Sequence, residues 1–149
     1  MNLKIASKKV LKWVPLFLVI CSVLLFTLHY LSIPAEPNYK QFQFDSILTQ
    51  MGNVKYRHSG RGHDLFVFIH GNSAPSPIWD RLIPELKDSV QILTYDLFGR
   101  GLSARPDQPH SPELYIYQLN QLLKNYKGSK IHLVGFSLGA SIAAKYANQ

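Results

Sequence analysis

The longest apolar segment of the sequence lies close to the N-terminus. Residues 13–33, WVPLFLVICSVLLFTLHYLSI, contain no Asp, Glu, Lys or Arg. A helix of this length rises about 30 Å, which is the thickness of the hydrocarbon core of a bilayer. We therefore expect one transmembrane helix, a signal anchor, over residues 13–33. A cleaved signal peptide is the alternative, which the long apolar segment and the poor cleavage pattern SIPAEP disfavour.

The charges around this segment predict its orientation. No acidic residue occurs before Glu36, and the segment is preceded by four lysines, Lys4, Lys8, Lys9 and Lys12. Because basic residues favour the cytoplasmic side, residues 1–12 are expected to form a basic cytoplasmic tail. The rest of the chain would then lie on the trans side, in the periplasm, lumen or exterior, with the lipid bilayer as a partner through residues 13–33. Residues 34–40 are expected to be a linker.

The remaining part, residues 41–149, alternates between two hydrophobic patterns. Short apolar runs bounded by turn signals predict strands, two within 41–58 and one each at 65–69, 90–95 and 131–134. Apolar positions with a helical period, together with Ser-Pro start signals, predict helices over 76–86, 111–127 and 138–147. Pro84 is expected to kink or end the first of these. Strands that alternate with helices are typical of an α/β fold, a mostly parallel sheet flanked by helices.

Composition narrows the classes of function. The formal net charge is +7, but from Pro34 onward twelve basic residues face nine acidic ones, so no footprint for nucleic acid is expected. The single cysteine, Cys21, excludes an internal disulfide and a cysteine-based metal site. No metal and no organic cofactor is predicted, because a second ligand at metal-binding spacing is missing beside His58, His63, His110 and His132.

One segment carries a chemical signal. Gly135, Ser137 and Gly139 form the pattern G-x-S-x-G between a predicted strand and a predicted helix. This context is that of a nucleophile elbow, a sharp turn that strains the serine backbone and exposes its hydroxyl. A β-carbon at either glycine is expected to collide with neighbouring backbone. The spacing therefore predicts Ser137 as a nucleophile.

Two further motifs follow predicted strands: His70-Gly71-Asn72, and Asp96-Leu97-Phe98-Gly99-Arg100-Gly101-Leu102-Ser103. With the elbow, they make the sequence resemble the α/β-hydrolase superfamily, over roughly residues 40–149. The resemblance implies that the backbone N–H groups of Asn72 and Leu138 form the oxyanion hole. It also implies structural roles for His70, Gly71 and Asp96 and for Gly99 and Gly101 in the turn, while Arg100 is interpreted as a turn or surface residue.

The superfamily orders its catalytic triad as Ser, then Asp or Glu, then His. No Asp, Glu or His follows Ser137 in this sequence. We therefore expect the N-terminal half of an α/β-hydrolase fold over residues 41–149, inactive as written. The predicted function is that of a serine hydrolase acting on carboxylic esters, lipids or related acyl compounds through a Ser-acyl intermediate. A non-catalytic membrane-tethered binding protein on the same scaffold, or an enzyme completed by a second chain, are the alternatives.

Overall fold

The computed structural model describes residues 3–32 and 42–149, which belong to two compact units, Met1–Asn38 and Tyr39–Gln149. The predicted tail and linker fall largely outside the described side chains.

The first unit contains helix α1, Leu3–Ser32. Ser22 Oγ donates to the carbonyl oxygen of Leu18 at 2.9 Å, and Thr27 Oγ1 donates to that of Val23 at 2.8 Å. Among the described residues, no helix is both long and apolar enough to cross a bilayer.

That finding contradicts the predicted transmembrane signal anchor over residues 13–33, and with it the bilayer partner and the single-pass localisation with a cytoplasmic N-terminus. The prediction rested on the length of a segment without charged residues. Inside that segment the apolar sequence is interrupted by polar side chains at Ser22, Thr27 and His29. The helix begins at Leu3, earlier than predicted, so Pro15 lies well inside it.

The second unit is built on a five-stranded sheet in the order β1-β2-β4-β3-β5. Its strands are β1 (Asp45–Thr49), β2 (Gly52–Gly60), β3 (Asp64–Ile69), β4 (Gln91–Tyr95) and β5 (Lys130–Gly135). β3 pairs in parallel with β4 and with β5, whereas β2 pairs antiparallel with β1 and with β4. The sheet is therefore mixed and not mostly parallel, because the two predicted strands within 41–58 form a hairpin at its edge.

Short and long helices connect the strands: η2 (Ser76–Trp79), α2 (Ile83–Leu86), α3 (Pro112–Leu123), η3 (Lys124–Tyr126) and α4 (Leu138–Ala147). The single helix predicted over 76–86 is split in two. Pro84 lacks an N–H and cannot continue a helix from the preceding turn, but it fits the first turn of a new one. α3 begins as predicted, with the side chain of Ser111 accepting from the N–H of Leu114 at 3.3 Å.

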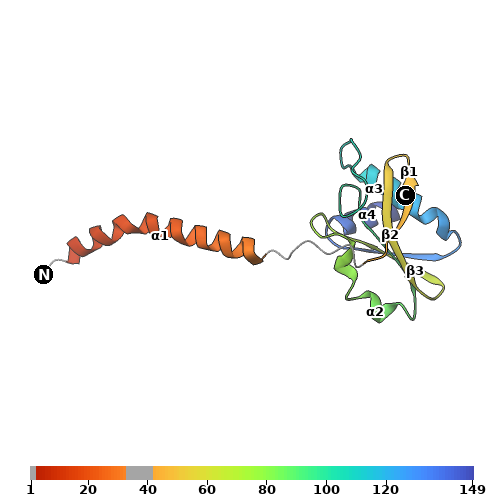
Figure 1. The fold of residues 1–149 in the computed structure, drawn as a ribbon, viewed down its shortest axis with the longest axis horizontal. Helices are drawn as coiled ribbons and strands as arrows, with labels where there is room; N and C mark the ends of the chain where they lie inside the picture. Colours follow the sequence, from red (N-terminus) through yellow and green to blue (C-terminus); the bar gives the residue numbers. More distant parts are fainter. Residues whose placement is uncertain (1–2, 33–41) are drawn as a thin grey trace. The chain divides into compact units, whose positions relative to one another are not determined.

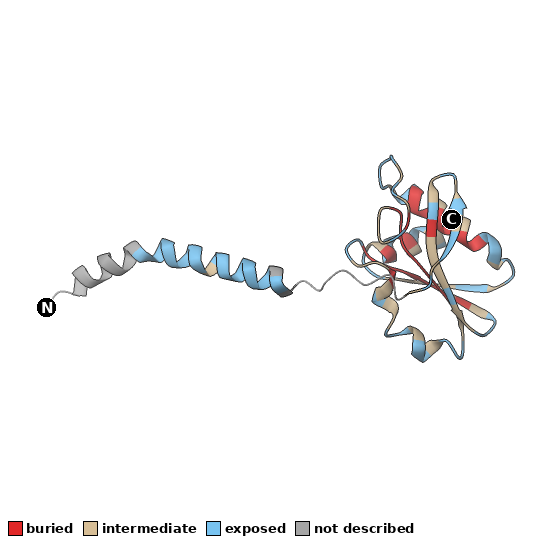
Figure 2. Ribbon diagram, in the orientation of Figure 1, coloured by how far each residue is buried: buried red, intermediate tan, exposed pale blue. Residues whose placement is uncertain are grey.

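The two faces of the sheet are covered differently. α3 and α4 pack on one face, over a core in which Leu65, Val67 and Leu93 are completely buried. On the other face, Phe68 contacts Trp79 of η2, with ring centroids 5.1 Å apart. Figure 1 shows α2 on the opposite side of the strands from α3 and α4, and Figure 2 shows buried segments gathered where α3 meets the central strands.

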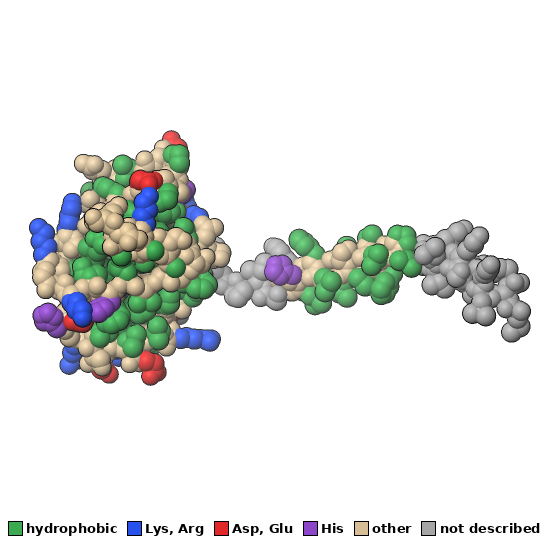
Figure 3. Space-filling model, turned by 180° about the vertical axis from the view of Figure 1, so that it is seen from behind, with side chains coloured by type: hydrophobic (Ala, Val, Ile, Leu, Met, Phe, Trp, Pro, Cys, Tyr) green, Lys and Arg blue, Asp and Glu red, His purple; other side chains and the backbone are tan. Residues whose placement is uncertain are grey.

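The surface of this unit carries both kinds of charge. On the face seen in Figure 3, Lys and Arg side chains are scattered among apolar patches, with Asp and Glu between them. The parallel strands β3, β4 and β5 all end at the same edge of the sheet, and the three sequence motifs follow these ends. That edge is where the candidate site lies.

Candidate active site

Ser137 occupies a strained turn between β5 and α4. Its backbone has φ 53° and ψ −118°, and it is the one non-glycine residue with positive φ in the described part of the chain. A non-glycine residue in such a conformation costs about 1–3 kcal/mol and persists only where the surrounding structure imposes it. The turn directs the chain sharply from the strand into the helix, as a nucleophile elbow requires.

The two glycines of the motif permit this turn. A β-carbon on Gly135 would lie 2.3 Å from the carbonyl oxygen of Gly139, and one on Gly139 would lie 2.1 Å from that of Ile69. Both distances are far below van der Waals contact, and in both the obstacle is backbone. The elbow is thus pressed against the end of β3, where the N–H of Phe136 also donates to the Ile69 carbonyl oxygen at 3.0 Å.

His70 follows β3 and is fully buried. Its Nδ1 donates to the carbonyl oxygen of Gly71 at 2.6 Å, and its Nε2 accepts from the N–H of Leu97 at 2.9 Å. Burial lowers the pKa of the imidazole, so the ring is neutral at neutral pH. With both ring nitrogens engaged, His70 ties the loop after β3 to the loop after β4 and offers no free nitrogen for proton transfer.

The loop after β3 also approaches the serine. A β-carbon on Gly71 would lie 3.2 Å from Cβ of Ser137, which places the peptide that carries the Asn72 N–H next to the elbow. Leu138, the residue after the serine, is the first of α4. Within the described residues, neither the N–H of Asn72 nor that of Leu138 donates a hydrogen bond. The structure thus brings two unused backbone donors close to Ser137.

Asp96, completely buried at the end of β4, organises two loops. Its Oδ1 accepts from the N–H of Ser76 and its Oδ2 from the N–H of Leu102, both at 2.9 Å. Gly101 packs directly on this carboxylate, since a β-carbon there would lie 2.1 Å from Oδ2. Gly99, with φ +77°, similarly leaves space for the ring of His110. The carboxylate therefore stabilises these two loops through its hydrogen bonds.

Sequence reasoning missed two side chains at this edge. Gln118, fully buried on α3, accepts from the N–H of Phe98 at 3.0 Å and donates to the carbonyl oxygen of Asp96 at 2.9 Å. A polar residue on the apolar face of the predicted helix was the signal that could have found it. Arg100 donates through Nε to the carbonyl oxygen of Asn72 at 2.7 Å and through Nη2 to Oδ1 of the same residue. No pattern in the sequence indicated that contact.

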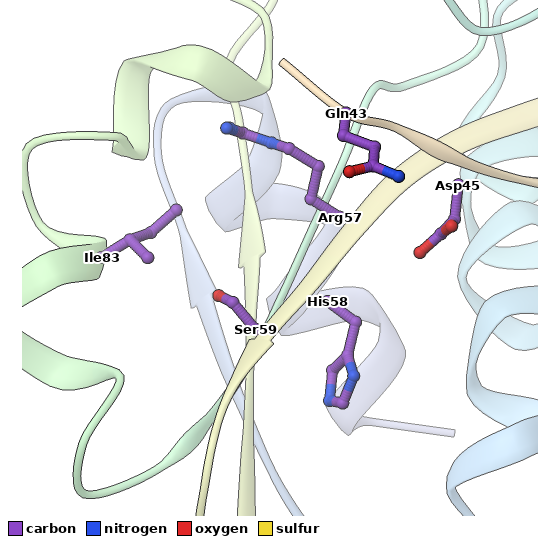
Figure 4. A pocket seen from close by; sticks show the side chains of 6 residues that line it. All are labelled: Gln43, Asp45, Arg57, His58, Ser59 and Ile83. Carbon is purple, nitrogen blue, oxygen red and sulfur yellow. The ribbon is translucent and has the colours of Figure 1, made fainter.

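A cavity of about 270 Å³ begins beside the elbow. It is lined mainly by apolar atoms, from His110, Pro112, Tyr115, Leu138, Ser141, Ile142 and Lys145. A second cavity, of about 390 Å³, lies on the antiparallel side of the sheet and contains none of the motif residues; Figure 4 shows the side chains around it. Of these two cavities, the first adjoins the candidate nucleophile through Leu138.

The described residues contain no group of three His, Cys, Asp or Glu side chains that could hold a metal ion. The chemistry available to the site is that of a strained serine, two backbone donors and an apolar cavity. A mixed sheet whose parallel strands end in an elbow, a His-Gly loop and an Asp-Gly turn defines the class of α/β hydrolases.

Comparison with known proteins agrees with this class. The sequence pattern of the Alpha/beta hydrolase family matches residues 66–148. Because that match covers more than half of the sequence, the chain belongs to the α/β hydrolase family.

Two curated relatives illustrate the extent of the similarity. The 2-(acetamidomethylene)succinate hydrolase of Mesorhizobium japonicum is 32% identical over 98 residues, which are 63% of this chain and 34% of that protein. The 2-hydroxy-6-oxo-6-(2'-aminophenyl)hexa-2,4-dienoic acid hydrolase of Metapseudomonas resinovorans is 29% identical over 93 residues, 59% of this chain and 31% of that protein. The chain thus spans about a third of the length of these relatives.

Solved structures show the same fold. An α/β hydrolase enzyme from a Medee basin deep-sea metagenome library superposes with a TM-score of 0.66 at 24% identity, covering 70% of this chain and 39% of that one. The structure of E-2-(acetamidomethylene)succinate hydrolase gives a TM-score of 0.62 at 28% identity, covering 70% of this chain and 40% of that one.

Proposed function

We propose that this chain carries the nucleophile and the oxyanion hole of a serine hydrolase acting on carboxylic esters or related acyl compounds. One observation supports this most strongly: Ser137 is held in a strained elbow, next to the two backbone N–H groups of Asn72 and Leu138, which have no acceptor among the described residues. Strain of this kind is retained where a function needs it.

The reaction would proceed in two steps. Ser137 Oγ attacks the carbonyl carbon as its proton passes to a general base, and the carbonyl oxygen becomes an oxyanion that accepts from Asn72 and Leu138. Collapse of this intermediate expels the alcohol or amine, which takes up the proton, and leaves an acyl group on Ser137. Water then attacks the acyl-serine by the same route and releases the acid.

The ten-residue helix α4 would assist the first step. It begins at Leu138, directly after the nucleophile, so its positive dipole end faces the developing negative charge. Losing one preorganised oxyanion donor typically costs about 10²–10³ in turnover. The two N–H groups and the helix together would therefore supply much of the stabilisation of the transition state.

Neither His70 nor the residues that follow Ser137 supply the general base. His70 has both ring nitrogens in hydrogen bonds, and no Asp, Glu or His follows Ser137 in the sequence. We propose that Ser137 depends on a base other than His70. Without a base a serine enzyme loses about 10⁴–10⁶ in turnover, so the chain alone should acylate slowly.

The names of these relatives indicate the size of the substrate. Both enzymes described above are named for hydrolysis of small organic acids. A cavity of about 270 Å³ beside Leu138 suits a group of that size, since a cavity of about 150 Å³ already holds benzene. We therefore propose a small-molecule acyl compound as the substrate.

An exogenous base provides the test. Hydrolysis of 4-nitrophenyl acetate by the full chain is followed at increasing imidazole concentration, beside Ser137→Ala as the control for the reaction of imidazole in solution. We expect a rate above that of the variant, with an excess that grows with imidazole. Equal rates at every concentration would overturn the proposal and favour a non-catalytic binding role.

A further inference from the structure

Arg100 is a cation whose partners at the site are all neutral. Its Nε and Nη2 donate to the carbonyl oxygen and Oδ1 of Asn72, and its Nη1 donates to the carbonyl oxygen of Gly99 at 3.0 Å. Within the described residues, no carboxylate forms an ion pair with it. Among the described residues, its guanidinium is therefore not paired directly with a carboxylate.

Arg57 differs from Arg100 in the groups that surround its guanidinium. Its Nη2 forms an ion pair with Asp80, and its guanidinium lies 4.9 Å and 5.2 Å from the ring centroids of Phe42 and Phe44. Figure 4 shows its side chain extending along the wall of the second cavity. This arginine has a compensating carboxylate and aromatic rings packed on it, as a structural cation does. Arg100 has neither among the residues that the structure describes.

The guanidinium of Arg100 also has N–H donors that make no hydrogen bond with the described residues. A guanidinium has five N–H groups in a fixed planar fork, and three of those of Arg100 are accounted for by Asn72 and Gly99. Because Nε and Nη2 hold the side that faces Asn72, the two remaining N–H groups lie on Nη1 and Nη2. N–H groups on both terminal nitrogens can donate to the oxygens of a carboxylate.

The position of Arg100 connects this free pair to the candidate active site. Asn72, which it holds, follows Gly71, the residue packed against Ser137. Gly99, whose carbonyl oxygen accepts from Arg100, packs against the ring of His110, and that ring lines the cavity beside Leu138. A group bound to Arg100 would therefore be near both the oxyanion hole and the apolar cavity.

We propose that Arg100 binds a free carboxylate of the substrate, so that the substrate class is esters or amides that carry a second, unreacted carboxylate. This inference rests on the proposed function of Ser137. The apolar body of the substrate would occupy the cavity lined by Leu138 and Tyr115. Arg100 also has a positioning role, because its hydrogen bonds hold Asn72 in place. Loss of these bonds should change the rates for all substrates by the same factor, so the ratio of two rates does not depend on it.

Paired substrates test the inference in the full chain with imidazole present. Mono-4-nitrophenyl glutarate is compared with neutral 4-nitrophenyl butyrate, and 4-acetoxybenzoate with 4-acetoxybenzamide, so that the carboxylate lies in the acyl part or in the leaving group. We expect a preference of about tenfold for the anionic member of at least one pair, the equivalent of one charge-assisted hydrogen bond. That preference should fall to about one in Arg100→Met.

Two further variants separate charge from folding. Arg100→Lys keeps the charge without the fork and should retain part of the preference. Arg105→Met removes an exposed arginine of the same loop and should keep all of it. Equal preference ratios in the unaltered chain and in Arg100→Met would overturn the inference.

A binding measurement does not depend on acylation. Glutarate is titrated into the full chain while the ¹⁵N signal of Arg100 Nε is followed, and we expect a saturable shift that sodium chloride weakens. No shift would overturn the inference even if Ser137 reacts. Conversely, a shift without acylation above the Ser137→Ala level would leave the anion site standing and refute the hydrolase function.

Discussion

At the scale of single residues, the backbone of Ser137 is the most unusual feature. Its φ of 53° and ψ of −118° are accessible to glycine at little cost and strained for any residue with a β-carbon. Replacing Ser137 by glycine should therefore release strain. We expect Ser137→Gly to raise the free energy of unfolding by about 1 kcal/mol, after the entropic cost of glycine is deducted.

Urea unfolding of the full chain measures this effect. Ser137→Ala is the matched control, because it removes the hydroxyl but keeps the β-carbon, and it should stay within about 0.5 kcal/mol of the unaltered chain. If Ser137→Gly were no more stable than Ser137→Ala, the elbow would not be strained and the main argument for a functional serine would be lost.

The same scale shows what a sequence can and cannot indicate. The spacing of Gly135, Ser137 and Gly139 identifies the turn, because a glycine is required where backbone approaches backbone, and that requirement is local. The contacts of Arg100 and Gln118 were not predicted, for the opposite reason. Their roles depend on which loop a long side chain reaches, and Asn72 and Asp96 are both more than twenty residues away from them.

At the scale of elements, α3 and α4 are joined by an exposed ion pair. Glu113, in the first turn of α3, pairs with Lys145 in the last turn of α4. The hydrogen bond from Lys145, aided by the backbone N–H of Glu113 and by Ser111, lowers the pKa of the carboxyl from about 4.5 to about 2. The charged form is therefore favoured in the folded state.

This shift predicts how stability depends on pH. A carboxyl whose pKa is lower in the folded state contributes fully above its unfolded pKa, near 4.5, and loses that contribution as the pH falls towards about 2. Glu113→Gln should be less stable than the unaltered chain at pH 6, and the gap should close by about pH 2. Urea unfolding at a series of pH values measures it, and a gap that stays constant would show that the carboxylate contributes nothing through its charge.

Element boundaries followed the sequence closely where one strong local signal decided them. The Ser111-Pro112 start and the apolar run at 65–69 gave α3 and β3 nearly as predicted. The region 76–86 did not, because the same proline chemistry can end one helix or begin the next. α1 showed a different limit: its helical pattern was evident, but a charge-free stretch alone was not enough to make it a membrane span.

At the scale of the whole molecule, the sequence predicted the family correctly and the sheet only in part. Alternation of strands and helices indicated parallel pairing, which holds for β3, β4 and β5. The antiparallel β1–β2 hairpin adds two strands that no helix separates. Parallel pairing was inferred from strands that alternate with helices, so that inference does not apply to the hairpin. The three motifs succeeded together because parallel strands bring their ends to one edge.

Reaction of the full chain with a fluorophosphonate, in the presence of imidazole, tests the central claim most directly. The serine oxygen would displace fluoride from phosphorus while imidazole takes the proton, and peptide mass spectrometry would locate the added group. We predict one phosphonyl group on Ser137 and none in Ser137→Ala. No modification of Ser137 after prolonged reaction, or equal labelling of the variant at another residue, would contradict the assignment of Ser137 as the nucleophile.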